Sequence, residues 1–240
     1  MSSFRNTDIL IIGSGLSGLS AALMLPDNLK ITLITKTTLD ECSTSWAQGG
    51  IASVLSNDDK FDIHIEDTLT NGHELNDRDV VEKIIKNGPL MINWLVDQKI
   101  KFSNKNRKLD LTLEGGHSKR RIVHAKDQTG KIIHDSLDKI VRNKKNITVK
   151  ENLQVIDVIC RGNSENKYCI GAYVYDSEIN KVITYSSKKV ILATGGAGKI
   201  YQYTTNPNTS TGDGIAIAWR AGCTISNMEF IQFHPTCLYH

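Results

Sequence analysis

One short segment near the N-terminus limits the fold more than any other, the glycine-rich turn GSGLSG at residues 13–18. It follows a continuous apolar run at residues 8–12 and precedes a helical pattern. A GxGxxG turn in this setting is typical of a dinucleotide-binding βαβ unit, because each glycine has a task. The first permits the tight turn, the second lets a pyrophosphate approach the backbone, and the third lets the helix pack on the strand. We therefore expect phosphates at the N-terminus of the helix; a glycine turn without a ligand is the alternative.

The hydrophobic pattern predicts an α/β fold with a mostly parallel sheet. Buried-strand runs are expected at residues 8–12, 30–35 and 189–193, a strand at 147–159, and a hairpin at 170–175 and 182–186. Helices are expected at residues 19–25, 62–101 with Asp77 as an N-cap, 127–141 and 215–221. Residues 103–110 are expected to form an exposed loop, and Lys119-Arg120-Arg121 is a candidate solvated charge run with no assigned role.

The composition excludes several classes of protein. The chain has 240 residues, of which 40% are hydrophobic and 23% are charged, so disorder, collagen and a coiled coil are excluded. No apolar run reaches the ~18 residues of a membrane span, and the first residues lack the apolar core of a signal peptide. The net charge of +3 is too small to indicate a nucleic-acid partner. We expect neither a membrane nor a nucleic acid as partner.

The cysteines and histidines indicate a reducing environment and no metal site. The five cysteines are odd in number, and none has CxxC spacing. The seven histidines form no HExxH motif and no Cys/His cluster. A cytoplasmic location without a bound metal is therefore expected.

Further motifs lie where a doubly wound sheet binds ligands. STSWAQGG at residues 43–50 combines hydroxyl groups with paired glycines, which suits close packing along a flat ligand, and an ordinary loop is the alternative. ATGGAG at 193–198 follows a buried strand, and TGDG at 211–214 leads into a helix. At the end of the second strand, Thr35-Lys36 replaces the usual acidic residue. Lys36 is expected to face the adenosine end as a donor, unless it is a solvated lysine.

Seven motifs in register resemble the succinate dehydrogenase, fumarate reductase and L-aspartate oxidase flavoprotein family. They are GSGLSG, STSWAQGG, EGGHS, RIVHAKDQTG, ATGGAG, TTNPNTSTGDG and MEFIQFHPT, and they extend over residues 8–240. Residues 113–125 and 201–207 are more similar to the aspartate oxidase branch than to the dehydrogenases. The resemblance implies a Rossmann-like FAD-binding domain with an inserted β-hairpin region.

The same resemblance implies FAD as a non-covalent cofactor. Family members with a tethered flavin carry a histidine in an SHT motif before the paired glycines, whereas Cys42-Ser43-Thr44 stands here. Serine has no imidazole, although soluble fumarate reductases also lack the tether. Asp213 is expected to accept a bond from the cofactor's hydroxyls, with helix capping as the alternative. The residues matched to the family's FAD contacts are Gly13, Ser14, Gly15, Leu16, Ser17, Gly18, Lys36, Ser43, Thr44, Ser45, Trp46, Ala47, Gln48, Gly49, Gly50, Gln154, Val155 and Asp213.

The implied reaction is oxidation of L-aspartate to iminoaspartate, with oxygen or fumarate as electron acceptor, in NAD synthesis through quinolinate. Glu114 matches a glutamate near the substrate amino group, where its charge attracts ammonium and repels succinate. An exposed loop glutamate is the alternative. His234 matches a histidine that binds a substrate carboxylate, and a packed histidine pinned by Pro235 is the alternative. Glu114 and His234 are thus the catalytic candidates.

Family members are more than twice as long as this chain. We expect residues 1–234 to form an incomplete FAD-binding domain and residues 235–240 to begin a truncated capping domain. On this hypothesis the chain is an N-terminal piece that is inactive alone. Its partners are a small-molecule substrate and, by functional coupling, quinolinate synthase. The alternatives are a fumarate reductase or succinate dehydrogenase-like flavoprotein, and a flavin-binding remnant without catalysis.

Overall fold

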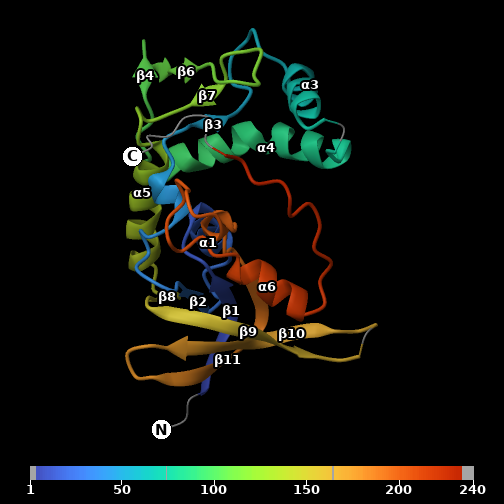
Figure 1. Cartoon of the computed structure of the whole chain (residues 1–240). Coiled ribbons are helices and arrows are strands. Elements are labelled where there is room, and N and C mark those ends of the chain that lie inside the picture. Colours follow the sequence, from blue (N-terminus) through green and yellow to red (C-terminus); the bar gives the residue numbers. More distant parts are fainter. Residues whose placement is uncertain (1–3, 74, 164, 234–240) are drawn as a thin grey trace. The chain divides into compact units, whose positions relative to one another are not determined.

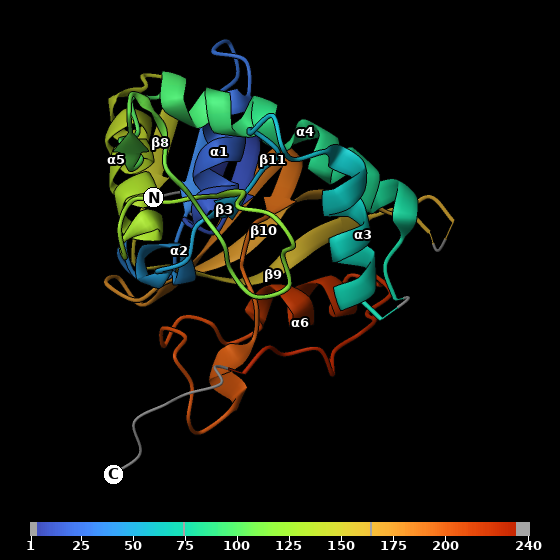
Figure 2. The ribbon, with the colours of Figure 1, turned by 90° about the horizontal axis from the view of Figure 1, so that it is seen from above.

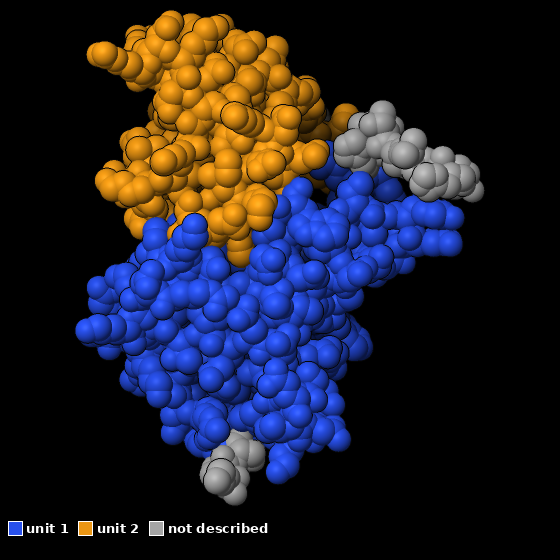
Figure 3. Space-filling view, turned by 90° about the vertical axis from the view of Figure 1, so that its left-hand side faces the viewer, with its two compact units in different colours: residues 1–46, 137–240 blue, residues 47–136 orange. Residues whose placement is uncertain are grey.

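The computed structural model describes residues 4–73, 75–163 and 165–233. The chain groups into two compact units, coloured separately in Figure 3. Unit 1 comprises residues 1–46 and 137–240, and unit 2 comprises residues 47–136. None of the helices within the described ranges has the length and apolar character that crossing a membrane requires.

Unit 1 is built on a six-stranded sheet with the order β8-β2-β1-β11-β10-β9 (Figure 1). The strands are β1 Phe4–Ile12, β2 Ile31–Ile34, β8 Ile147–Lys150, β9 Leu153–Arg161, β10 Tyr168–Asp176 and β11 Lys181–Leu192. β8, β2, β1 and β11 run parallel, whereas β10 is antiparallel to both β11 and β9. The predicted α/β fold with a mostly parallel sheet is confirmed.

The two central strands of the parallel part, β1 and β2, are covered on both faces. Residues 9–12 of β1 and all four residues of β2 are buried. Helix α1 (Leu16–Met24) follows β1 and packs against β1 and β2. It ends before Pro26, as the sequence predicts, because proline has no N–H to continue a helix. A strand covered on both faces needs apolar residues at every position, and this explains the continuous runs.

β11 is one long strand where the pattern suggested two. Residues 181–186 pair with β10 in an antiparallel hairpin, while the register with β1 runs from Thr184 to Leu192. The expectation of separate strands at 182–186 and 189–193 is therefore wrong. The alternating part and the continuously apolar part belong to one strand whose surroundings change along its length.

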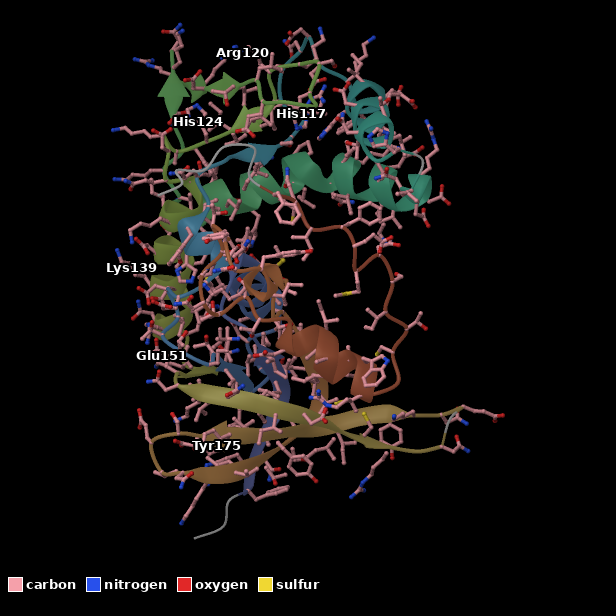
Figure 4. The ribbon with its side chains drawn as sticks, in the orientation of Figure 1. His117, Arg120, His124, Lys139, Glu151 and Tyr175 are labelled. Atoms are coloured by element: carbon pink, nitrogen blue, oxygen red, sulfur yellow. The ribbon has the colours of Figure 1, made fainter. Side chains whose placement is uncertain are left out.

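The expected strand at 147–159 is instead divided into β8 and β9. Asn152 has a φ of 57°, a left-handed conformation that lets the chain turn between the two strands. Glu151, labelled in Figure 4, accepts hydrogen bonds from Leu39 N (2.9 Å) and Arg142 Nη2 (3.0 Å) at this corner. Leu153 N then donates to Thr35 O at 3.0 Å, which brings the start of β9 to the end of β2.

The core of unit 1 lies between the parallel strands, the antiparallel strands and α6 (Asp213–Arg220). Its buried members are Leu10, Ile12, Ile34, Leu153, Val155, Ala172, Val174, Ile183, Tyr185 and Ile217. The remaining helical segments are α2 (Ser43–Trp46), the 3-10 turn η1 (Gly198–Ile200) and α5 (Thr129–Asn143), which begins in unit 2 and ends in unit 1.

Unit 2 combines two helices with short strands. Its elements are β3 Ile51–Ala52, α3 Phe61–Asn71, α4 Arg78–Asp97, β4 Asn104–Lys105, β5 Lys108–Leu109, β6 Leu111–Thr112 and β7 Ile122–Val123. α3 and α4 pack together (Figure 2) through Ile65, Val81 and Ile85. The Asp77 side chain accepts from Val80 N at 3.1 Å, so the predicted N-cap is confirmed. The helical pattern expected over 62–101 forms two helices, α3 and α4, the second of which begins after Asp77. The loop expected at 103–110 contains the small β4–β5 hairpin.

Candidate functional site

A cavity of about 400 Å³ lies in unit 1 where β1, β2 and β11 end. Backbone hydrogen bonds hold these three ends together. Gly13 N donates to Ile34 O at 2.8 Å, and Ala193 N donates to Ile12 O at 2.8 Å. The carboxyl edge of a parallel sheet is where such folds bind ligands, and three turns converge on it here.

The glycines of the first turn have distinct geometric roles. Gly13 has a φ of 116°, and a Cβ there would overlap the carbonyl oxygen of Ala193. A Cβ on Gly18 would overlap the carbonyl oxygen of Gly13. The predicted tight turn and close helix packing are therefore confirmed. Gly15 is different, since a Cβ there would approach only the Thr44 hydroxyl, at 3.3 Å, and Gly15 lines the cavity.

The N-terminus of α1 faces the cavity. Gly15 is its N-cap and supplies no capping side chain, and the first turn holds no acidic residue. Leu16 N donates to Thr44 Oγ1 at 2.9 Å. The partial positive charge of this helix end thus has no carboxylate of its own turn to neutralise it. An anion such as a phosphate is well placed to do so.

Lys36 and Asp213 form an ion pair on the cavity lining. Lys36 Nζ lies 2.8 Å from Asp213 Oδ2 and 2.6 Å from Thr211 Oγ1, and Thr211 donates to Asp213 Oδ1 at 2.6 Å. Burial raises the pKa of the Asp213 carboxyl, but the hydrogen bonds from Lys36 and Thr211 outweigh it, so this pKa lies below its ordinary value. Gly212 is the N-cap of α6 and Asp213 the first residue of that helix, so the capping alternative for Asp213 is wrong.

Ser43 occupies a position rich in hydroxyl groups. Its Oγ lies 3.0 Å from Ser210 Oγ and 3.5 Å from Asn206 Oδ1. Ser14, buried nearby, donates to Thr35 Oγ1 at 3.1 Å and to Leu39 O at 3.0 Å. The polar side of the cavity is thus built from small hydroxyl side chains with defined partners.

The structure brings most of the predicted cofactor residues of unit 1 together. Those that line the cavity are Gly13, Ser14, Gly15, Leu16, Ser17, Lys36, Ser43, Thr44, Gln154, Val155 and Asp213. Gly18, Ser45 and Trp46 are not among the lining residues. Sequence reasoning did not assign Glu41, Cys42, Thr209 and Ser210, which also line it. For the last two, the signal was available in the TTNPNTSTGDG motif, which was used only as a family resemblance.

The other predicted residues lie in unit 2, around a second cavity of about 350 Å³. Gln48, Gly49, Gly50 and Glu114 line it, together with Thr112, His124, Lys126 and Asp127, whereas Ala47 does not. A Cβ on Gly49 would lie 3.9 Å from Glu114 Oε2, and one on Gly50 would overlap the carbonyl oxygen of Val123. Gly50 therefore lets the chain pass close to β7, and Gly49 lies beside the Glu114 carboxylate.

Buried charges hold the loop that carries Glu114. Asp67 accepts hydrogen bonds at Oδ2 from Ser118 N and Oγ and from Arg121 Nη1, at 2.9, 2.8 and 2.6 Å. Arg121 also donates from Nε and Nη2 to Asp59, both at 2.8 Å. Burial raises the pKa of the Asp67 carboxyl, but its bonds from Ser118 and Arg121 outweigh this and lower it. Arg121 is fully buried, so the solvated charge run expected at 119–121 is wrong for this residue.

His124 lines the second cavity and has no role predicted from the motifs. It follows β7, and Figure 4 labels it with His117 and Arg120 in unit 2. Its Nε2 is buried without a hydrogen-bond partner among the described residues, and Asp110 Oδ2 lies 3.6 Å away. The other catalytic candidate, His234, lies outside the described residues.

Comparison with known proteins gives a family match over nearly the whole chain. The model of an FAD binding domain matches residues 8–240. L-aspartate oxidase from Yersinia pestis is 48% identical, in a match that covers 100% of this chain and 46% of that protein. L-aspartate oxidase 1 from Ralstonia nicotianae is 48% identical, with 98% of this chain and 45% of that protein covered. The chain therefore spans under half the length of these curated relatives.

A solved structure shares the arrangement of the elements. Escherichia coli quinol fumarate reductase FrdA matches with a TM-score of 0.93 at 29% sequence identity. The match covers 99% of this chain and 40% of that chain. The fold of this chain thus recurs as part of a much longer chain.

Proposed function

Because the chain belongs to the family of FAD-binding domains, we propose that it forms the cofactor half of an enzyme that oxidises L-aspartate to iminoaspartate. The single observation that carries the cofactor assignment is the cavity at the ends of β1, β2 and β11, which the N-terminus of α1 faces with no acidic residue in its first turn. The support for aspartate as substrate is the 48% identity to two proteins named L-aspartate oxidase.

The residues present fit FAD. The pyrophosphate carries negative charge, and the α1 N-terminus offers N–H groups beside Gly15, where an added Cβ would stand in the cavity. Lys36 and Asp213 supply a donor and an acceptor on the same lining, suited to the hydroxyls of an adenosine or ribityl group. Gln154 and Val155 offer backbone and side-chain groups from the start of β9. FAD is accordingly the cofactor of this domain.

The proposed attachment of the cofactor is non-covalent. Ser43 stands where a tethering histidine would be required, and its hydroxyl is engaged with Ser210 and Asn206. A serine oxygen offers no imidazole nitrogen to the flavin. Binding then depends on the glycine turn, the helix end and the polar lining of the cavity.

The proposed substrate chemistry assigns Glu114 to the amino group. When bound, FAD supplies a flavin that accepts a hydride from the substrate Cα. Glu114 lies in the unit 2 cavity beside Gly49, on a loop held by Asp67 and Arg121. A carboxylate held in this way attracts an ammonium group and disfavours a dicarboxylate that lacks one. His234 is proposed to bind a carboxylate of the substrate.

The proposal also covers the surroundings of the reaction. Oxygen or fumarate is proposed as electron acceptor, the imino product as the substrate of quinolinate synthase, and the cytoplasm as location. The cysteines among the described residues form no disulfide, in keeping with a reducing compartment. The proposed domain limits are residues 1–234 for the FAD-binding domain and 235–240 for the start of a capping domain.

Two measurements test the proposal in order. Titration of the 240-residue chain with FAD, followed by flavin fluorescence, is expected to give saturable binding; a chain that is folded by circular dichroism but binds no FAD would contradict the cofactor assignment. A protein that carries this chain with the further residues of its relatives is then assayed with L-aspartate, succinate and fumarate. Oxidation of succinate in preference to aspartate would favour the fumarate reductase-like alternative, and bound FAD with no turnover would favour a remnant.

A further inference from the structure

Cys160 and Cys169 face each other across the β9–β10 hairpin of unit 1. They are direct cross-strand partners in the antiparallel register. Residues opposite each other in such a pair have Cα atoms about 4.5–5.5 Å apart and side chains on the same face of the sheet. A disulfide requires Cα atoms about 4.4–6.8 Å apart. The backbone therefore already holds the two thiols at a distance that a disulfide can span.

Local contacts also connect the two thiols with their surroundings. Cys169 Sγ donates to Gly171 O at 3.4 Å. Burial raises the pKa of the Cys160 thiol, and the neighbouring Cys169, also through a hydrogen bond, raises it further. The two side chains are thus close enough to interact directly. Both residues are partly exposed, so a small oxidant has access to them.

The backbone beside the cysteine pair contains a β-bulge. The register shifts between Cys169 and Gly171, where Ile170 is the extra residue of a bulge. Gly171 has a φ of 151°, and a Cβ there would overlap the carbonyl oxygen of Tyr185 on β11. This glycine allows β10 to lie tightly on β11 while the bulge increases the local twist. The cysteines are thus fixed by the sheet on one side of the bulge.

We propose that Cys160 and Cys169 form a peroxide-responsive thiol pair, which a peroxide converts to an intramolecular disulfide. The sulfur of one cysteine attacks one peroxide oxygen, the O–O bond breaks, and with hydrogen peroxide a sulfenic acid and one water are formed. The sulfur of the other cysteine then attacks the sulfenic acid sulfur, its proton joins the departing hydroxide, and a second water leaves. The two thiols lose two electrons and two protons in total, and the peroxide is reduced to two waters.

This proposal does not depend on the proposed function, since any peroxide serves as the oxidant. The position of the pair nevertheless connects it with the cofactor cavity. Cys160 lies on β9, whose first residues, Leu153 to Val155, line that cavity. Arg220 of α6 also binds β9, through Asp157 Oδ2 and Ile156 O, both at 2.8 Å. A disulfide would therefore stiffen a strand that supports the cavity wall.

Tryptic cleavage provides a direct test, because the residues between the cysteines include Arg161 and Lys167. Cleavage after them places Cys160 in peptide 151–161 and Cys169 in peptide 168–181. The folded 240-residue chain is treated with stoichiometric hydrogen peroxide, its free thiols are alkylated, and the digest is analysed by mass spectrometry. We expect the two peptides to appear joined, with about 2 Da less than their summed mass because two hydrogens are lost.

Variants separate the two steps. Cys160→Ser and Cys169→Ser are each expected to abolish the linked peptide. The cysteine that remains in each variant is expected to be left as a sulfenic acid that dimedone traps. The matched control is Cys223→Ser, which removes an exposed cysteine elsewhere and is expected to leave linkage unchanged. If peroxide leaves peptides 151–161 and 168–181 separate in the wild-type chain, whether alkylated or over-oxidised, the proposal is overturned without reliance on any variant.

Discussion

Lys36 Nζ and Asp213 Oδ2 lie 2.8 Å apart and join the end of β2 to the first turn of α6. Each is the partner of the other on the lining of the unit 1 cavity, and Thr211 bonds both. A ligand hydroxyl that enters here meets a donor and an acceptor that are already oriented. The ion pair is therefore expected to contribute both to the stability of the fold and to cofactor binding.

Asp213→Asn is expected to lower the free energy of unfolding by about 1 kcal/mol at neutral pH. The folded-state pKa of Asp213 lies below its ordinary value, so its contribution to stability is present above pH 3.8 and is lost as the pH falls through the folded pKa. Urea unfolding from pH 7 down to acid should therefore show the wild type and the variant converging. Asp27→Asn, on a carboxylate with a 74% exposed side chain, is the control and should change stability by less than about 0.5 kcal/mol. A difference that stays constant with pH would contradict the ion-pair explanation.

Gly15→Val is expected to weaken FAD binding by about tenfold or more, equal to at least about 1.4 kcal/mol. The added side chain would stand in the cavity where the α1 N-terminus faces it, and its Cβ would approach only the Thr44 hydroxyl. The free energy of unfolding should fall much less than in Gly13→Ala. The Cβ of that variant would overlap a carbonyl oxygen, at a position with a φ of 116°. Flavin fluorescence titration and urea unfolding of both variants distinguish the two effects. Equal FAD affinity in folded Gly15→Val would remove this turn from the cofactor site.

Acid precipitation of the flavin-loaded protein is expected to leave the yellow colour in the supernatant. Ser43 has a hydroxyl bonded to Ser210 and Asn206, and it offers no nitrogen for a tether. The absorbance of the supernatant near the flavin maximum measures the released cofactor. Flavin that remains with the denatured pellet would show a covalent link and would overturn this prediction.

Arg121→Met is expected to destabilise unit 2 by about 3–5 kcal/mol, because it leaves the buried Asp59 carboxylate without its partner. The matched control is the adjacent Arg120→Met, which removes an exposed guanidinium that donates only to Leu111 O among its described contacts. Urea unfolding followed by tryptophan fluorescence compares them. Similar midpoints for the two variants would contradict a structural role for the Arg121 network.

Glu114→Gln is expected to reduce kcat/KM for L-aspartate by about one to two orders of magnitude, in a protein that carries this chain with the further residues of its relatives. A charge-assisted contact contributes roughly 1.5–3 kcal/mol, and each 1.36 kcal/mol is about tenfold in rate. Fumarate has no ammonium, so its reduction should change little. The ratio of the two activities in one preparation is the measurement. A parallel fall of both would indicate that Glu114 shapes the loop, and no change in either would remove it from the substrate site.

Local patterns were sufficient to predict the parallel sheet and the glycine turn. Continuous apolar runs mark strands covered on both faces, and the turn residues have sterically defined roles, as at Gly13 and Gly18. The division between β8 and β9 was not predictable in this way. It depends on the left-handed Asn152 and on Glu151 bonding to Leu39, a residue 112 positions earlier in the chain.

The site was less predictable where burial depends on tertiary contacts. Arg121 belongs to a cationic run and looked solvated, yet Asp59 and Asp67 neutralise it inside unit 2. No feature of the sequence around His124 predicts that this residue lines a cavity. The STSWAQGG motif was treated as one site, but the structure assigns its first residues to the unit 1 cavity and its glycines to the cavity of unit 2.

The position of β11 beside β1 has a consequence for synthesis on the ribosome. β1 is translated first, but its neighbour β11 spans residues 181–192. The pairing of β1 with β11 at the centre of the sheet can therefore form only after β11 has been synthesised. Unit 2, at residues 47–136, can begin to fold much sooner. The apolar residues of β1 lack β11 as a neighbour until then. Pairing over such a sequence separation is slow, and the waiting strand is a natural client for a chaperone.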